Sequence, residues 1–335
     1  MSMTLPLSHS IRLIPLVAAV VAGATLCAPG GAQARSLDDA NFTGPLITPN
    51  PAGVAQGHLY VEPYLIRVDS RSSYDGAGNR HRSAQDSGAW LAVMPIIYGL
   101  GERVTVQANL SAVRAESGSA RSSGFRAGDT TARLQYLLQA PSADGTRPAV
   151  SLALSQRYAT GSHDRVGGNP LNAQGDGVQR TSLALGIQQV VWMPNDRPLR
   201  WRGQLSASPA PARVAVHGHS VYDTPAGFRG SVARGSTLSG SLAAEYSINP
   251  RWVAVMEAAA SRETRHRLIG YAPDAQGIAQ HIDEVRPAST SLTLAPAIEY
   301  HFTPKIGLIA GVEFSVAGRN SGHFISPQVA LGMYF

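Results

Sequence analysis

Apolar and polar residues alternate at every second position in segment after segment of this chain. In the clearest segment, residues 104–112, Val, Val, Ala, Leu and Ala alternate with Thr, Gln, Asn and Ser. Because successive side chains of a β-strand point to opposite faces, this alternation predicts a strand with one apolar and one polar face. Twelve such strands are expected, at residues 59–68, 90–98, 104–112, 132–138, 150–157, 183–191, 199–208, 238–246, 252–261, 292–300, 306–314 and 325–335.

The connections between these segments alternate between short and long. The short ones are residues 99–103, 140–147, 194–198, 247–251 and 301–305, and the long ones are 69–87, 114–128, 159–179, 209–235 and 262–289, with 317–321 brief among them. Tight turns at one end and long polar loops at the other are typical of outer-membrane barrels. We therefore predict an all-β fold, a transmembrane antiparallel up-and-down β-barrel of about twelve strands over residues 57–335.

A soluble exported β-sandwich is the alternative, because its strands also alternate. A sandwich would place bulky apolar faces in a shared core, whereas here the polar faces hold small and charged residues and the apolar faces hold the bulk. Aromatic residues also gather near both ends of the predicted strands, as expected at two membrane interfaces. They are Tyr98, Trp192, Tyr246, Trp252, Tyr300 and Phe302 beside short turns, and Trp90, Tyr158 and Phe324 near long loops.

Both termini fit an exported barrel. Residues 1–34 have a signal-peptide pattern, with an apolar run after Arg12 and a small-residue site at Ala32-Gln33-Ala34. Residues 35–56 are then expected to form an N-terminal periplasmic segment. The chain ends on Phe335 in the lipid-facing phase, which is similar to the C-terminal signal that barrel assembly machinery recognises. We expect localisation in a bacterial outer membrane, with both barrel termini in the periplasm.

The amino-acid composition argues against several classes of partner and site. The chain has 28 basic and 22 acidic residues, but the arginines are scattered singly, so no nucleic-acid partner is expected. The single cysteine, Cys27, lies in the leader, which leaves no disulfide, thiolate metal site or cysteine nucleophile. His217 and His219 share one loop, and two ligands do not make a metal site. No cofactor or metal is expected.

Ionisable residues fall on the inward phase of several strands. They are Arg133, Arg157, Arg200, Arg202, Glu62, Glu245, Glu257, Glu299 and Glu313. Because an isolated buried charge is costly, these groups should pair or face water. One interpretation is a selectivity lining for a polar or mildly amphipathic solute, and the other is a static ion-pair network that plugs a narrow barrel. The loops at 161–176 and 209–235 are long enough to constrict the mouth.

A lipid hydrolase would need serine and histidine side chains converging with an orienting residue. These residue types lie close in sequence at residues 161–163, 217–220 and 321–323, but the sequence identifies no third partner. We therefore predict that the protein is not an enzyme. A structural or adhesion barrel without transport stays open as an alternative.

Several short motifs resemble a known family. They are Thr43-Gly44-Pro45, the turn Tyr98-Gly99-Leu100, Gly128-Asp129 before a strand that ends in two leucines, and Thr160-Gly161. Together they are similar to the outer-membrane transporter family named for the meta-pathway of phenol degradation. The resemblance implies passive uptake of small hydrophobic or aromatic solutes. We expect a monomeric channel whose partners are outer-membrane lipids, the assembly machinery and a small organic solute.

Overall fold

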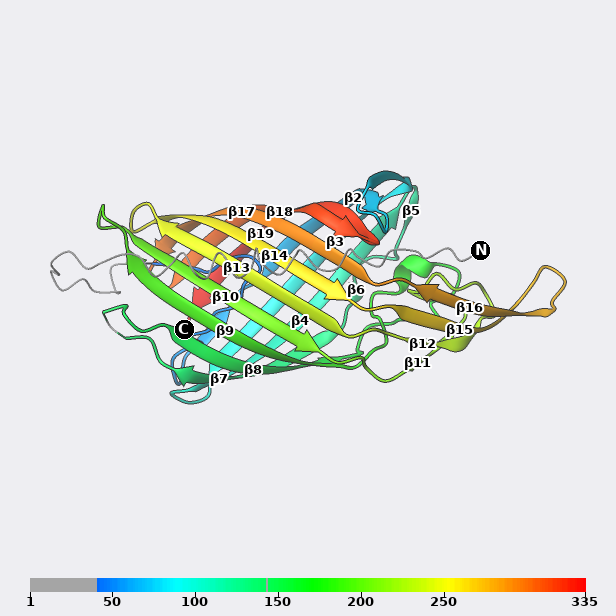
Figure 1. Cartoon of the computed structure of the whole chain (residues 1–335), viewed down its shortest axis with the longest axis horizontal. Coiled ribbons are helices and arrows are strands. Elements are labelled where there is room, and N and C mark those ends of the chain that lie inside the picture. The colour runs from blue at the N-terminus through cyan, green and yellow to red at the C-terminus, as the bar shows by residue number, and fades with distance from the viewer. Residues whose placement is uncertain (1–40, 143) are drawn as a thin grey trace, which may run out of the picture. The chain divides into compact units, whose positions relative to one another are not determined.

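The computed structural model describes residues 41–142 and 144–335 (Figure 1). Twelve long antiparallel strands form a closed barrel in which each strand pairs with both of its neighbours. Within this described part, no helix is long and apolar enough to cross a membrane. The strands are β2 (Tyr64–Tyr74), β3 (Arg80–Gly99), β4 (Val104–Ser117), β7 (Thr130–Gln139), β8 (Ala149–Tyr158), β9 (Arg180–Trp192), β10 (Pro198–Ser208), β13 (Thr237–Ser247), β14 (Trp252–Glu263), β17 (Ser289–Thr303), β18 (Ile306–Arg319) and β19 (Ser321–Tyr334).

Ring closure occurs between the first and last strands. β2 pairs with β3 on one side and with β19 on the other, and the short β1 (Leu59–Val61) bridges β3 and β19 at the short-turn end. There Leu59 and Phe335 exchange backbone hydrogen bonds at 2.8 and 3.2 Å, while the Phe335 side chain is exposed. Closure leaves every long strand with two partners, as hydrocarbon requires.

The barrel exposes apolar side chains on its outer face and buries polar ones in its lumen, the reverse of a soluble protein. Outward-pointing Leu154 and Leu205 are half exposed, whereas inward-pointing Glu245 and Glu299 are fully buried. Exposed leucines around a closed barrel are favourable against lipid and unfavourable in water. The predicted transmembrane barrel is therefore confirmed, and the sandwich alternative is wrong.

Five strands extend well beyond the predicted bounds at the long-loop end. The expected loop 69–87 is mostly a continuation of β2 and β3, closed by a turn at residues 75–79. In this turn the Asp75 carboxylate accepts hydrogen bonds from the Ala77 and Asn79 backbone and lies 2.8 Å from His81 Nε2. The contact with His81, followed by those with the backbone, holds the pKa of Asp75 well below its usual range. Residues 80–87 are polar on both faces, so alternation could not mark them as strand.

Two predicted loops instead form a second, four-stranded sheet. It contains β11 (Val214–His217), β12 (Arg229–Ala233), β15 (His266–Pro273) and β16 (Ala279–Arg286), in that order. Figure 1 shows this sheet beyond the ends of the barrel strands that it connects. Val216, Phe228, Val232 and Leu268 form its buried core. The long-loop end also contains β5 (Ala120–Arg121), β6 (Arg126–Ala127) and the 3-10 helix η3 (Pro170–Asn172).

The segment before β1 lies inside the barrel. Asn41 donates to the carbonyl of Pro250 in a short turn, and the chain then enters the lumen and returns to the same end, where Gly57 N donates to Gly99 O. We call residues 41–56 the finger. Its Phe42 and Leu46 pack against a small apolar cluster on the inner wall. The described part of the expected N-terminal segment 35–56 thus lies in the lumen, and residues 1–40, with the predicted leader, lie outside the described residues.

Candidate functional site

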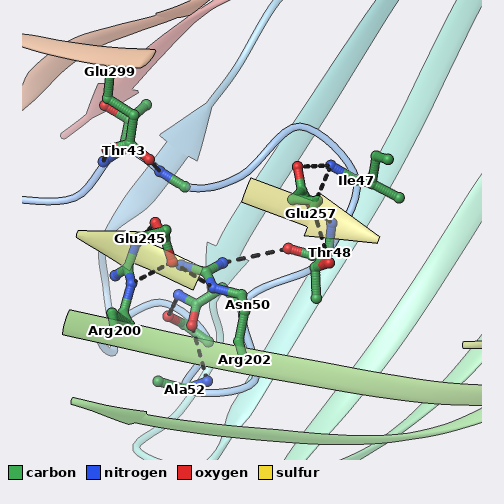
Figure 2. Close-up of polar contacts among 12 residues, drawn as sticks. Thr43, Ile47, Thr48, Asn50, Ala52, Arg200, Arg202, Glu245, Glu257 and Glu299 are labelled. Atoms are coloured by element: carbon green, nitrogen blue, oxygen red, sulfur yellow. Dashed lines mark hydrogen bonds and ion pairs between the residues drawn. The ribbon is translucent and has the colours of Figure 1, made fainter. Parts of the chain in front are cut away.

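A buried ion-pair network spans β10 and β13 in the lower half of the lumen, near the short turns. Arg200 and Glu245 face each other in register, and the guanidinium binds both carboxylate oxygens, at 2.8 and 2.5 Å. Arg202 Nε lies 3.1 Å from the same carboxylate, and its Nη1 donates to Thr48 O of the finger at 3.4 Å. One barrel carboxylate thus binds two arginines, one of which also holds the finger (Figure 2).

Two further carboxylates hold the finger backbone. Glu299 accepts hydrogen bonds from Thr43 N at 2.7 Å and Gly44 N at 3.1 Å. Glu257 accepts from Thr48 N at 2.8 Å, from Thr48 Oγ1 at 2.9 Å and from Ile47 N at 3.1 Å. Figure 2 shows both carboxylates pointing at the finger from the barrel wall. They supply acceptors for N–H groups that have no neighbouring strand.

Other walls of the barrel complete the attachment. Gln135 of β7 donates to Asn50 O and Pro51 O, each at 3.0 Å, and Thr105 of β4 accepts from Val54 N at 3.2 Å. On β10 the Arg200 guanidinium lies 4.3 Å from the centre of the Phe42 ring, within cation–π range. The finger is therefore fixed to several strands around the lumen, and side chains rather than strand pairing hold it there.

Two glycines allow the path of the finger. Gly44 has a φ of +131°, which other residues rarely adopt. Gly53 has a φ of +74°, and a Cβ there would lie 2.4 Å from Thr105 Oγ1. Gly44 belongs to Thr43-Gly44-Pro45, so this motif lies where the finger meets Glu299.

The remaining predicted lumen residues lie nearer the long loops. Arg133 donates to Gln204 at 2.8 Å, and Arg157 forms an ion pair with Asp176. Glu313 and Ile47 of the finger line the same cavity. Thus the structure brings Arg200, Arg202, Glu245, Glu257 and Glu299 together around the finger and keeps Arg133, Arg157 and Glu313 apart from them. Glu62, also predicted to face inward, is buried and accepts from Tyr60 and Tyr64.

Above the finger, two adjoining cavities of about 250 Å³ each occupy the long-loop half of the lumen. Both are lined by Ser239. The upper one is lined by Arg157, Arg180, Arg234 and Glu263 with several serine hydroxyls, and the lower one by Ile47, Phe324, Glu313 and small residues. Arg180 and Glu263 are not among the lumen residues predicted from the sequence, although extending two predicted strands by two or three residues places both on the inward phase.

The motif Gly128-Asp129 anchors a long loop. The Asp129 carboxylate accepts from Gly161 N at 3.0 Å and from Asp176 N at 3.1 Å, and Thr160 Oγ1 donates to Gly128 O at 3.1 Å. A Cβ on Gly128 would lie 2.4 Å from Ser111 Oγ. The two family-like motifs, distant in sequence, therefore meet and tie the loop 159–179 to the top of β7.

The Ser–His stretches have other partners. Ser220 Oγ is buried and bonded to Thr224 Oγ1 at 2.6 Å, while the backbone N–H and Nδ1 of His217 contact Asp164 at 2.9 and 3.1 Å. His163 Nε2 contacts the carbonyl of Ala215 at 3.2 Å. The contacts of His163 and His217 join the loop 159–179 to β11 of the four-stranded sheet.

Comparison with known proteins supports the fold. Neither a family model nor a curated protein matches the chain. An outer membrane channel from Pseudomonas putida F1 superposes with a TM-score of 0.60 at 15% identity, over 86% of this chain and 100% of that one. This chain has an outer-membrane β-barrel fold. The translocator domain of the autotransporter NalP from Neisseria meningitidis gives a TM-score of 0.42 at 17% identity, over 83% and 88% of the two chains. The toluene transporter TbuX from Ralstonia pickettii gives 0.31 at 10%, over 85% and 92%.

Proposed function

We propose that this protein is a monomeric channel of a bacterial outer membrane that admits small organic solutes passively. The observation that carries the proposal is the division of the lumen. Its long-loop half contains two cavities, and its short-turn half contains a finger that barrel side chains hold, with one backbone bridge, Gln56 to Gly99, at the end of the finger. Because no barrel strand depends on the finger for pairing, the finger can leave the lumen while the barrel stays closed.

We place the short turns and both barrel termini in the periplasm and the four-stranded sheet outside the cell. On this assignment a solute meets the cavities first and the finger second, so the finger controls release on the periplasmic side. The outer membrane channel from Pseudomonas putida F1 that superposes on this chain supports a channel function. Membership of the phenol meta-pathway family is part of this proposal, and the structural roles of Gly44, Gly128 and Asp129 support it.

Single-channel conductance in planar bilayers tests the proposal. We compare the mature chain with a variant lacking residues 41–56, after a heat-dependent shift in gel mobility has shown that both barrels are folded. The expected result is small or rare steps for the intact chain and larger steps for the deletion. A folded, inserted deletion variant without conductance would exclude a channel whose lumen is closed by the finger.

One observation favours a second function, adhesion. The four-stranded sheet has its own buried core, and its outer strands, β11 and β16, each have one edge without a partner among the described strands. Such edges accept extended partners. An adhesion barrel would stay silent in the conductance test with or without the finger.

A further inference from the structure

The upper cavity has more cationic than anionic side chains in its wall. Its wall carries three guanidinium groups, those of Arg157, Arg180 and Arg234, and one carboxylate, that of Glu263. The side chains of Arg180 and Arg234 are 11% and 21% exposed, so water screens them only partly. Guanidinium groups that are largely shielded from water favour an anionic partner.

The existing contacts leave part of this charge without a carboxylate. Arg234 binds both oxygens of Glu263, at 3.0 and 2.9 Å, which uses most of the capacity of that carboxylate. Arg180 forms a longer ion pair with Glu263, at 3.5 Å, and its hydrogen bonds go to Gly235 O at 3.1 Å and Thr237 Oγ1 at 2.8 Å. Both of those acceptors are neutral, so Arg180 has the weakest charge compensation of the three arginines.

Only one part of the Arg157 guanidinium has a carboxylate partner. Its Nη2 contacts Asp176, which does not line the cavity, and its Nε is buried without a hydrogen-bond partner among the described residues. The nearby Asp129 directs its two oxygens to backbone N–H groups. The three arginines of the cavity therefore have two carboxylates within ion-pair distance, those of Asp176 and Glu263.

The adjoining lower cavity has a different character. Ile47, Ala259, Ala260 and Phe324 give it apolar surface, and Glu313 is its ionisable residue. Together the two cavities offer a cationic end and an apolar end. This division matches an organic molecule with one anionic group and a hydrocarbon body.

We propose that the upper cavity binds the carboxylate of an organic acid, between Arg157 and Arg180, while the hydrocarbon part of the acid lies in the lower cavity. The proposal rests on the proposed function and specifies its solute class. A planar carboxylate fits the fork of a guanidinium, and a bound carboxylate would give the three arginines a third carboxylate partner. The hydroxyls of Ser206 and Thr237, which also line the cavity, add donors for the same group.

The test compares benzoate with benzamide, which has nearly the same shape and no charge. We measure the binding of each to the full mature chain in non-ionic detergent by isothermal titration calorimetry, with detergent alone as the blank. We expect benzoate to bind at least about tenfold more tightly than benzamide, because only benzoate meets the arginines as an ion. Added chloride should weaken the binding of benzoate.

Charge-neutral variants identify the site. Arg157→Gln and Arg180→Gln should each weaken benzoate binding by about tenfold or more and leave benzamide unchanged. Glu313→Gln should strengthen benzoate binding, because it removes a like charge from the lower cavity. Arg82→Gln is the matched control, since that side chain is 81% exposed on the β2–β3 hairpin and lies outside both cavities. Heat-dependent gel mobility verifies the fold of each variant.

Equal binding of benzoate and benzamide would overturn the proposal, and so would benzoate binding that survives both arginine substitutions. Conductance of the same preparations separates this inference from the proposed function. If the chain conducts and does not bind benzoate, the carboxylate site fails alone. If the chain binds benzoate and the finger-deletion variant does not conduct, the carboxylate site is supported and the channel function is refuted.

Discussion

Glu257 offers the sharpest test of how the finger is held. Its carboxylate accepts the backbone N–H groups of Ile47 and Thr48 and the hydroxyl of Thr48, with the shortest contact at 2.8 Å. Glu257→Ala leaves both backbone donors without an acceptor when the finger is seated, whereas water satisfies them when it is not. At about 1.5 kcal/mol for each hydrogen bond to a charged group, the two backbone donors alone amount to about 3 kcal/mol. That shifts the equilibrium between seated and unseated finger by about two powers of ten.

Amide hydrogen exchange measures this equilibrium directly. Thr48 is buried and 2% exposed, so its amide should exchange only when the finger leaves Glu257. We expect its protection to fall by about a hundredfold in Glu257→Ala and single-channel conductance to rise with it. Glu313→Ala is the control, because it also removes a lumen carboxylate but none of the finger contacts described above. Unchanged protection of Thr48 in a folded Glu257→Ala barrel would refute the idea that this carboxylate seats the finger.

Three further predictions concern other parts of the molecule. Arg200→Gln leaves the buried carboxylate of Glu245 poorly compensated and should lower the free energy of unfolding by about 3 kcal/mol in urea titrations, whereas adding Glu245→Gln should recover part of that loss. Burial lowers the pKa of His266, so its neutral form favours the four-stranded sheet and that stability is lost as the pH falls below about 6.5. The protection factors of the amides in β15, corrected for the intrinsic exchange rate, should fall there, and His266→Phe should abolish this dependence on pH. Asp129→Ala removes two backbone contacts and should make the loop 159–179 a protease site while conductance stays intact; a loop that resists cleavage equally in both proteins would contradict this role.

The sequence by itself determined the barrel. Period-two alternation is a local property, and in lipid it must continue wherever a strand crosses the hydrocarbon, so all twelve crossing segments could be recognised from it. The same alternation fixed the inward phase of Arg200 and Arg202, because Leu199 and Trp201 occupy the opposite face. Beyond the hydrocarbon this constraint ends. The polar ends of β2 and β3 and the whole four-stranded sheet therefore lie in segments that the pattern could mark only as loops.

Only the tertiary structure decided what fills the barrel. The finger has no alternation of its own, and its position depends on acceptors such as Glu257 and Glu299, about 210 and 255 residues away in sequence. Which of the inward charges meet is also non-local, since it follows from strand tilt and register around the closed ring. That geometry pairs Arg200 with Glu245, and it gathers Arg157, Arg180 and Arg234 at one cavity from three different parts of the chain. Alternation determines whether a side chain points into the lumen or toward lipid, and the closed ring determines which other side chains it contacts.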